Sequence, residues 1–259
     1  MKLRVCAVSY LNTMPLVWGM LRGRQRGLFD LAFRLPAECA DRLAAGEADV
    51  GIVPSVELER LGLEVLPGAG IASRGPIRSI LLISKVPPAR IRTLAADSAS
   101  RTSVALAGIV LEERFGVQPR LLRRAPHLDA MLEEADAALL IGDPALRVDP
   151  AALPYRTLDL GAEWMALSGL PMVFAVWAGR PERLSPGLAE AFLDSCRFGR
   201  AQLEEIVREE AAPRGIPEAL AREYLTARVV NELGRQEYRG LRAFLERARQ
   251  WSAATYHAE

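Results

Sequence analysis

Hydroxyl and amide side chains gather in three loops of this sequence, each near a point where a helix is predicted to begin. The residues are Asn12, Thr13, Ser55, Ser98, Ser100, Thr102 and Ser103, and Arg101 lies among the last of them. Free backbone N–H groups and the positive end of the helix dipole favour an anion at a helix start, each contact contributing roughly 0.3–1 kcal/mol. Such residues are also ordinary N-caps, so one loop alone would indicate only a cap. Three loops in equivalent positions, with Arg101 available for a charge-assisted fork, indicate a cleft for a carboxylate or phosphate.

Other constellations that carry chemistry do not occur in the sequence. Its two histidines are His127, at a predicted helix start where a surface or capping role is expected, and His257, close to the C-terminus. Cys6, Cys39 and Cys196 fit neither a disulfide framework nor a zinc site, and we interpret them as small core residues. There is no Gly-rich phosphate loop, nucleophile elbow or metalloprotease helix. We therefore expect chemistry without a metal, nucleotide or other cofactor.

Charge and hydropathy favour a small ligand over a macromolecular partner. The 259 residues include 33 Lys and Arg against 32 Asp and Glu, so no net field attracts nucleic acid or an acidic membrane surface. No apolar stretch reaches transmembrane length without a charge or a Pro/Gly break. The opening residues lack the apolar core and cleavage site of a signal peptide, so we expect a cytoplasmic protein.

Short buried strands alternate with helices and would position the donor-rich loops. Residues 3–8 read as a buried strand, and Pro15 lies in the first turn of the helix that follows, where its missing N–H costs nothing. A helix over residues 37–45 precedes a strand over residues 50–53. The same order returns over residues 127–144, which fits either duplicated halves or the common order of α/β units. The alternation predicts an α/β fold with mainly parallel sheets, whose strands are buried on both faces.

Two apolar runs, residues 77–84 and 172–177, are longer or richer in β-forming residues than the others. Each is suited to a strand at which the chain passes from one lobe of a two-lobed protein to the other. Between them, a helix is predicted over residues 102–115, with one apolar stripe and Gly116 as its stop. The pattern then becomes helical: Ser185 is predicted to cap a helix that starts at Pro186, and further helices are predicted from Pro217 and from about Gly234. These elements predict two lobes and leave open whether the last helices cover the first lobe or form a dimer contact.

Five segments of the chain carry a combined pattern: Val8 to Leu16, Arg78 to Lys85, Asp97 to Leu106, Ala135 to Leu146 and Gly169 to Trp177. In this order they resemble the chorismate dehydratase family of the futalosine route to menaquinone. The resemblance covers residues 5–178, and its combination of loops is specific because no composition or periodicity alone would produce it. Ser168 and Met172 depart from the family pattern, where Thr and Phe are expected, and bear on the cleft wall.

The resemblance implies a two-lobed, type II periplasmic-binding-protein-like α/β fold, with a mainly parallel sheet flanked by helices in each lobe. Lobe I would comprise residues 1–84, and lobe II residues 85–175. Residues 176–259 would return to lobe I and add the C-terminal helices. The lobes would close on a small molecule, chorismate, with neither nucleic acid nor a membrane as partner, and the oligomeric state stays open.

The implied activity removes water from chorismate and gives 3-[(1-carboxyvinyl)oxy]benzoate. The predicted substrate-binding residues are Thr13, Ser55, Ser100, Arg101, Thr102, Ser103, Gly142 and Asp143, and the predicted catalytic residues are Asn12 and Ser79. Residues 100–103 would hold one carboxylate from lobe II, while the first-lobe residues receive other polar groups of the substrate.

The identity of the base is a separate question. In the matched loops, Asp97 and Asp143 are the only candidates for a protein base. Asp143 lies at a loop corner, where an aspartate typically caps a turn. We therefore hypothesise that the enolpyruvyl carboxylate of the substrate itself takes the C3 proton, with Asn12 and Ser79 orienting it.

Three alternatives use the same features. A transporter's solute-binding protein would share the fold and the anion-binding loops, but it would normally carry an export signal. The sister enzyme that forms dihydroxynaphthoate in the same pathway would be expected to use a cleft histidine, and histidine is scarce here. A non-catalytic sensor of chorismate or another aromatic acid would share most of the contacts.

Overall fold

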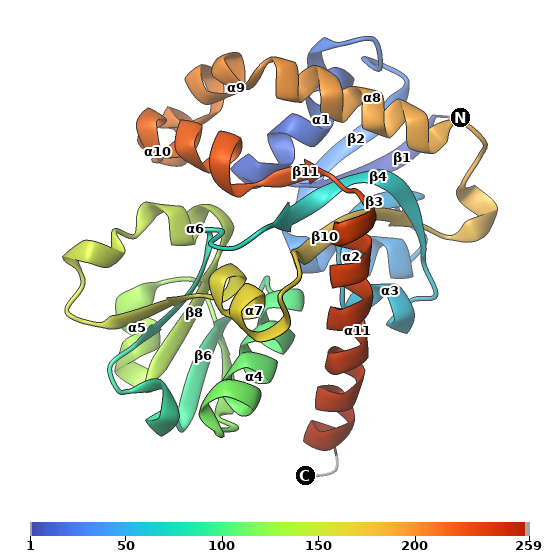
Figure 1. Ribbon diagram of the computed structural model, residues 1–259. Helices are drawn as coiled ribbons and strands as arrows, with labels where there is room; N and C mark the ends of the chain where they lie inside the picture. Colours follow the sequence, from blue (N-terminus) through green and yellow to red (C-terminus); the bar gives the residue numbers. More distant parts are fainter. Residues whose placement is uncertain (1, 257–259) are drawn as a thin grey trace.

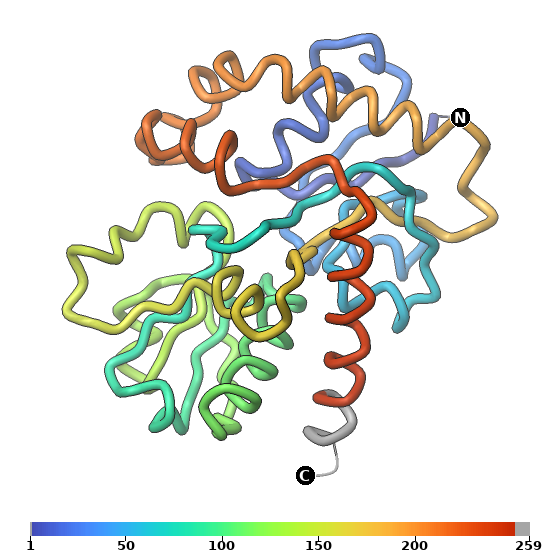
Figure 2. The backbone as a smooth tube through the Cα atoms, in the orientation of Figure 1, coloured from blue at the N-terminus to red at the C-terminus, as the bar shows by residue number. Residues whose placement is uncertain are grey.

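The computed structural model describes residues 2–256, with side chains described as far as residue 251, and it has two lobes (Figures 1 and 2). The first sheet has the strand order β11-β4-β10-β3-β1-β2 and the second the order β7-β6-β8-β5-β9. The strands of the first sheet are β1 Leu3–Val8, β2 Phe29–Arg34, β3 Val50–Pro54, β4 Glu64–Ser73, β10 Met172–Gly179 and β11 Val230–Glu232. Those of the second are β5 Ile80–Ser84, β6 Thr93–Asp97, β7 Arg120–Arg124, β8 Ala137–Ile141 and β9 Arg156–Asp159.

Helices flank both sheets. The α-helices are α1 Met14–Arg22, α2 Pro36–Ala44, α3 Glu57–Arg60, α4 Thr102–Phe115, α5 Leu128–Glu134, α6 Gly142–Arg147, α7 Leu160–Ser168, α8 Leu188–Ala201, α9 Leu203–Glu210, α10 Glu218–Glu223 and α11 Arg235–Tyr256. Short 3₁₀ turns are η1 Leu11–Thr13, η2 Pro88–Arg90, η3 Pro150–Ala152, η4 Pro181–Arg183 and η5 Ala212–Arg214, and η6 Tyr224–Arg228 is a π-helical turn.

The two-lobed α/β fold is confirmed, but the sheets are mixed rather than mainly parallel. In the first sheet, β1 is parallel to β2 and β3, whereas β10 runs antiparallel between β3 and β4. In the second, β6 is parallel to β7 and β8, whereas β5 is antiparallel to β8 and β9. The strands β5 and β10 each follow a crossing between lobes, so no βαβ unit fixes their direction.

The chain changes sheet between β4 and β5 and returns between β9 and β10. Residues 84 and 175, the expected lobe limits, lie at the end of β5 and inside β10. Both apolar runs do form strands. All of β5 and nearly all of β10 are buried. A strand at the centre of either sheet would be equally buried, so its apolar sequence does not indicate to which sheet it belongs.

Local signals place some helix ends well and others poorly. Helix α4 ends as predicted, because Gly116 has a left-handed φ of 69° that L-residues rarely adopt. Helix α8 begins two residues after Pro186, because Gly187, with φ 82°, occupies its N-cap position. Residues 142–144 form the first turn of α6 rather than the predicted loop, since Gly142 with φ 60° lets the chain turn directly from β8 into a helix.

The core of the first lobe packs α1 and α8 against the sheet. Trp177 of β10 and Phe192 of α8 meet edge to face with ring centroids 4.8 Å apart. Cys6, Cys39 and Cys196 are all buried and free, which confirms their interpretation as small core residues.

The C-terminal helices take two different positions relative to the lobes. Helices α8, α9 and α10 cover the first lobe, whereas α11 leaves it and runs beside α4 of the second lobe (Figures 1 and 2). A Cβ added at Gly108 of α4 would lie 2.3 Å from the ring of Trp251, and Arg247 of α11 pairs with Glu113 at 3.4 Å. Helix α11 therefore joins the two lobes.

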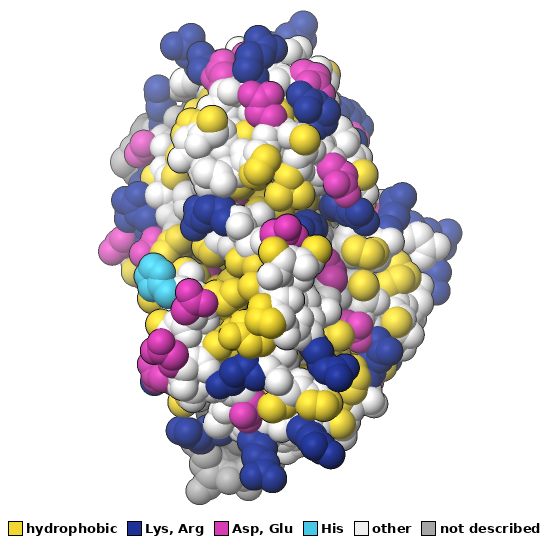
Figure 3. All heavy atoms as spheres, turned by 90° about the vertical axis from the view of Figure 1, so that its left-hand side faces the viewer, with side chains coloured by type: hydrophobic (Ala, Val, Ile, Leu, Met, Phe, Trp, Pro, Cys, Tyr) yellow, Lys and Arg dark blue, Asp and Glu magenta, His cyan; other side chains and the backbone are white. Residues whose placement is uncertain are grey.

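The face of the molecule in Figure 3 carries positive and negative side chains interspersed, a pattern typical of solvated surfaces. His127 is exposed at the start of α5 and makes no side-chain cap, whereas His257 lies outside the described residues. No helix in the described part of the chain combines the length and the apolarity needed to cross a bilayer.

Candidate active site

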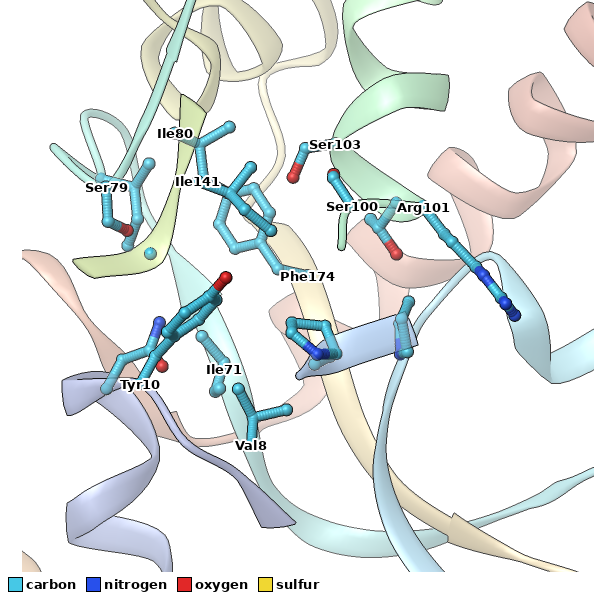
Figure 4. Close-up of a pocket in the computed structure, with 17 residues that line it drawn as sticks. Val8, Tyr10, Ile71, Ser79, Ile80, Ser100, Arg101, Ser103, Ile141 and Phe174 are labelled. Atoms are coloured by element: carbon cyan, nitrogen blue, oxygen red, sulfur yellow. The ribbon is translucent and has the colours of Figure 1, made fainter. Parts of the chain in front are cut away.

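A pocket lies between the lobes, next to the carboxyl ends of β1, β3 and β8 (Figure 4). Its empty volume is about 530 Å³, and part of this space is open to solvent. The walls are largely apolar and include Val8, Ile71, Ile80, Ile141 and Phe174. Ligands of open α/β sheets bind at this end of the strands.

The N-terminus of α4 faces this pocket with unused hydrogen-bond donors. Arg101 occupies the N-cap position and provides no side-chain cap for the first turn of this 14-residue helix. The Ser100 hydroxyl is buried and has no partner within the described residues, and Ser103 lies on the same wall (Figure 4). Free O–H and N–H donors and the helix dipole together suit a carboxylate.

Asn12 and Ser79 lie on the opposite side and are linked through Tyr224. Asn12 Nδ2 donates to the Tyr224 hydroxyl at 2.9 Å, and this hydroxyl donates to Ser79 Oγ at 2.8 Å. All three residues are buried. A carboxamide has two N–H bonds and a serine hydroxyl has a hydrogen of its own, so each keeps one donor for a ligand. The structure thus brings the two predicted catalytic residues together.

Gly142 and Tyr10 set the shape of the wall near Ser79. A Cβ at Gly142 would lie 2.3 Å from Cδ2 of Tyr10, so only glycine allows the ring to pack there. The Gly142 N–H also donates to the Ser79 carbonyl oxygen at 2.8 Å. The Tyr10 phenol points toward the centre of the pocket (Figure 4), and burial raises its pKa, so it stays protonated at neutral pH.

Arg101 lines the pocket but directs its guanidinium away from the centre (Figure 4). It pairs with Asp41 at 2.6 Å and with Glu57 at 3.0 Å. Both acids belong to the first lobe, so these ion pairs cross the cleft. The guanidinium is thus paired with two protein carboxylates, and its fork to a substrate carboxylate stays a prediction.

Of the predicted residues Thr13, Ser55 and Thr102, one lines the pocket and two do not. Thr102 lines the pocket and accepts a hydrogen bond from the Val56 N–H at 3.3 Å. Thr13 and Ser55 are fully buried and lie outside the pocket wall. Ser55 Oγ donates to the Val173 carbonyl oxygen at 2.8 Å, so the hydrogen of this hydroxyl is used to hold β10.

The two candidate protein bases are also outside the wall. Asp143 accepts a hydrogen bond from the Leu11 N–H at 2.9 Å, which joins α6 of the second lobe to the first lobe. Asp97 accepts one from the Ala99 N–H at 2.9 Å, and its other oxygen has no partner within the described residues. Burial raises the pKa of both carboxyls. Their positions fit structural roles.

Sequence reasoning missed Tyr10, Phe174 and Tyr224. The first two lie inside segments that were singled out, and their aromatic rings beside polar loops were a usable signal. Tyr224 lies in the helical tail, 212 positions from Asn12, with no local signal of its own. Ser168 and Met172, which depart from the family pattern, do not line the pocket.

Metal-ligating side chains do not gather here or elsewhere among the side chains described: no group of three or more His, Cys, Asp or Glu is placed to hold an ion. The polar groups of the pocket are hydroxyls, amides and helix N–H groups, which serve as donors to anions.

Comparisons with known proteins agree with the fold and with the predicted resemblance. A protein from Archaeoglobus fulgidus superimposes with a TM-score of 0.78 at 18% identity, over 97% of this chain and 98% of that one. The periplasmic aliphatic sulphonate binding protein of Escherichia coli gives a TM-score of 0.66 at 16% identity, over 95% of this chain and 85% of that one. At these identities the likeness concerns the fold alone.

Sequence comparison identifies the family. The chorismate dehydratase of Thermus thermophilus is 33% identical over 238 residues, which cover 84% of this chain and 86% of the relative. The profile of the family described as menaquinone biosynthesis matches residues 3–250, which extends the resemblance through the C-terminal helices. The predicted resemblance is confirmed, and the chain belongs to the menaquinone biosynthesis family.

Proposed function

We propose that this protein is a chorismate dehydratase that acts as a hydro-lyase. The observation that carries the proposal is a single apolar pocket with two separate sets of anion donors, one at the start of α4 and the other formed by Asn12 and Ser79. Membership of the menaquinone biosynthesis family and a 33% identical chorismate dehydratase support it. The futalosine route and a cytoplasmic location are parts of the same proposal.

Chorismate carries two carboxylates on one ring, and the two donor sets suit them. The ring carboxylate binds Ser100, Ser103 and the free N–H groups of α4, where the helix dipole favours negative charge. The enolpyruvyl carboxylate binds the free N–H of Asn12 and the free O–H of Ser79. The ring lies against apolar walls such as Phe174, which exclude water.

The elimination then needs a base at C3 and a leaving hydroxyl at C4. The enolpyruvyl carboxylate, held by Asn12 and Ser79, takes the C3 proton. The electron pair of the C3–H bond forms the new ring double bond while the C4–O bond breaks. The hydroxyl leaves as water, taking up a proton that the new carboxylic acid returns. Aromatisation drives the step, so the protein contributes orientation and electrostatic stabilisation.

The test is to incubate the purified protein with chorismate in excess chelator and to follow the products by liquid chromatography and mass spectrometry. Loss of one water to give 3-[(1-carboxyvinyl)oxy]benzoate is expected. Unchanged chorismate that nevertheless raises Tm would identify a binding or sensing protein instead, as the likeness to a sulphonate binding protein allows. Activity that is lost in chelator and restored by added metal would refute the metal-free mechanism.

The identity of the base is tested by Asp143→Asn. The asparagine carbonyl still accepts the Leu11 N–H, so turnover should persist if the substrate supplies the base. Loss of a protein base would instead slow turnover by about 10²- to 10⁴-fold. Abolished turnover with intact chorismate binding would therefore contradict substrate-assisted elimination.

A further inference from the structure

Tyr224 occupies a central place in the site although it comes from the C-terminal segment. It begins the π-helical turn η6, is 1% exposed, and contacts both Asn12 and Ser79 through its hydroxyl. π-Helical turns inside helical segments are frequent at functional sites. We propose that Tyr224 is a positioning residue, which sets the direction in which Asn12 and Ser79 present their hydrogens to the substrate; this rests on the proposed dehydratase function.

The donors and acceptors around the Tyr224 hydroxyl allow one arrangement of its hydrogen. The Asn12 N–H can only donate, so the Tyr224 oxygen accepts it at 2.9 Å. The one phenol hydrogen must then find an acceptor in a buried site, and Ser79 Oγ at 2.8 Å provides it. The Ser79 hydrogen consequently remains free to point into the pocket. Burial raises the pKa of Tyr224, so the phenol keeps its hydrogen across the physiological range.

The same C-terminal segment also holds the backbone of the loop that carries Asn12. Asn231, buried in β11, donates through Nδ2 to the carbonyl oxygen of Asn12 at 3.4 Å and to that of Gly70 at 3.2 Å. Asn12 is thus restrained at its side chain by Tyr224 and at its backbone by Asn231. With its backbone fixed and its side chain bonded to Tyr224, Asn12 loses the rotamer freedom that would otherwise misdirect its remaining N–H.

The hydroxyl of Tyr224 also connects parts of the site that belong to different lobes. Asn12 follows β1 of the first sheet, whereas Ser79 directly precedes β5 of the second. The two donors are far apart in sequence, and Tyr224 is the shared contact that fixes their relative orientation. It aligns the donors that receive the enolpyruvyl carboxylate and leaves the α4 donors for the ring carboxylate unaffected.

The experiment compares Tyr224→Phe with wild type and with Tyr238→Phe. Phenylalanine keeps the buried ring and removes only the hydroxyl. Tyr238 is a matched control because its hydroxyl accepts one hydrogen bond, from the Gly68 N–H at 2.8 Å, away from the pocket. Active-site concentration is measured by calorimetric titration with 3-[(1-carboxyvinyl)oxy]benzoate, so that a loss of folded protein is not counted as a loss of kcat.

We expect kcat per active site to fall about 10- to 100-fold in Tyr224→Phe, since misplacement of an orienting group by about 1 Å has effects of this size. KM should change by less than about threefold, because the α4 donors are untouched. Tyr238→Phe should keep the wild-type kcat. Retained kcat in Tyr224→Phe, or a loss confined to Tm and the active fraction, would overturn the positioning role.

A double variant separates positioning from an independent effect. If Tyr224 acts through Ser79, the slowing of Ser79→Ala/Tyr224→Phe should be smaller than the product of the two single effects. Multiplicative effects would contradict the inference. Wild-type protein that fails to dehydrate chorismate would refute the proposed function and the inference with it, whereas active wild type with unimpaired Tyr224→Phe would refute the inference alone.

Discussion

Gly142→Ala should damage both the stability and the site of this protein, through one identifiable contact. Gly142 has φ 60°, a left-handed conformation that costs an L-residue about 1–2 kcal/mol. The added Cβ would also lie 2.3 Å from Cδ2 and 2.7 Å from Cγ of Tyr10. Carbon atoms pack best at about 3.5–4.0 Å, so the ring must move by roughly 1 Å, and overpacking of this kind costs about 1–3 kcal/mol.

Gly116→Ala is the matched control. Gly116 ends α4 with φ 69°, and a Cβ there would have no atom within 4 Å. It should therefore lose only the conformational part of the free energy of unfolding. A difference of about 1–3 kcal/mol between the variants corresponds to a further fall in Tm of roughly 2–12 °C for Gly142→Ala, at about 2–4 °C per kcal/mol.

Activity separates the two variants more sharply. Tyr10 lines the pocket, so its displacement should lower turnover at subsaturating chorismate by at least about tenfold. Gly116→Ala should match wild type in the same assay, with thermal unfolding followed in parallel by differential scanning calorimetry. Equal Tm values for the two alanine variants, or full activity of Gly142→Ala, would show that the Tyr10 contact does not constrain this position.

Two further predictions concern buried polar groups. Ser100→Ala should raise KM about 10- to 100-fold with little change in kcat, because a hydrogen bond to a charged group is worth about 1.5–3 kcal/mol. Ser55→Ala should leave KM unchanged and lower Tm, since the Ser55 hydroxyl donates to the Val173 carbonyl. Steady-state kinetics that show an unchanged KM for Ser100→Ala and a raised KM for Ser55→Ala would contradict both assignments. Burial raises the pKa of Asp97, so native stability should fall as pH rises from the unfolded value near 3.9 through the raised folded value. The Tm of Asp97→Asn minus that of wild type should therefore be more positive at pH 7 than at pH 3.5, and a difference that shrinks with pH would be evidence against an ionising buried carboxyl.

The sequence predicted those features that depend on nearby residues. Helix α4 was placed correctly because an apolar stripe and Gly116 lie within one short segment, and the strands β1, β3 and β8 are apolar runs of ordinary length. The direction and sheet of β5 and β10 could not be predicted, because these depend on which strands the chain meets after crossing between lobes. A fully buried strand has the same composition in either sheet.

Side-chain partners were predictable only in type. Hydroxyl-rich helix starts indicated donors, and Ser100 and Ser103 do lie at the pocket. A serine hydroxyl can turn about χ1 toward a ligand or toward a carbonyl oxygen of a neighbouring strand. Which of these it reaches depends on residues that are distant in sequence, as with Ser55 and the Val173 carbonyl oxygen. Tyr224 could not be found at all, since its role exists only through contacts with residues that are distant in sequence.

The charge around the pocket bears directly on a base supplied by the substrate. A cation beside the enolpyruvyl carboxylate would lower its pKa and weaken it as a base, whereas desolvation by apolar walls raises the pKa of a carboxyl group. Among the lining residues in the described part of the chain, Arg101 is the one with a formal charge, and Asp41 and Glu57 neutralise it and hold it away from the centre. Neutral donors such as Ser79 can then orient the carboxylate while preserving more of its basicity than a cation would. In the proposed mechanism, the interlobe ion pairs therefore have a chemical consequence besides holding the lobes together, because they keep positive charge away from the substrate carboxylate that would accept the proton.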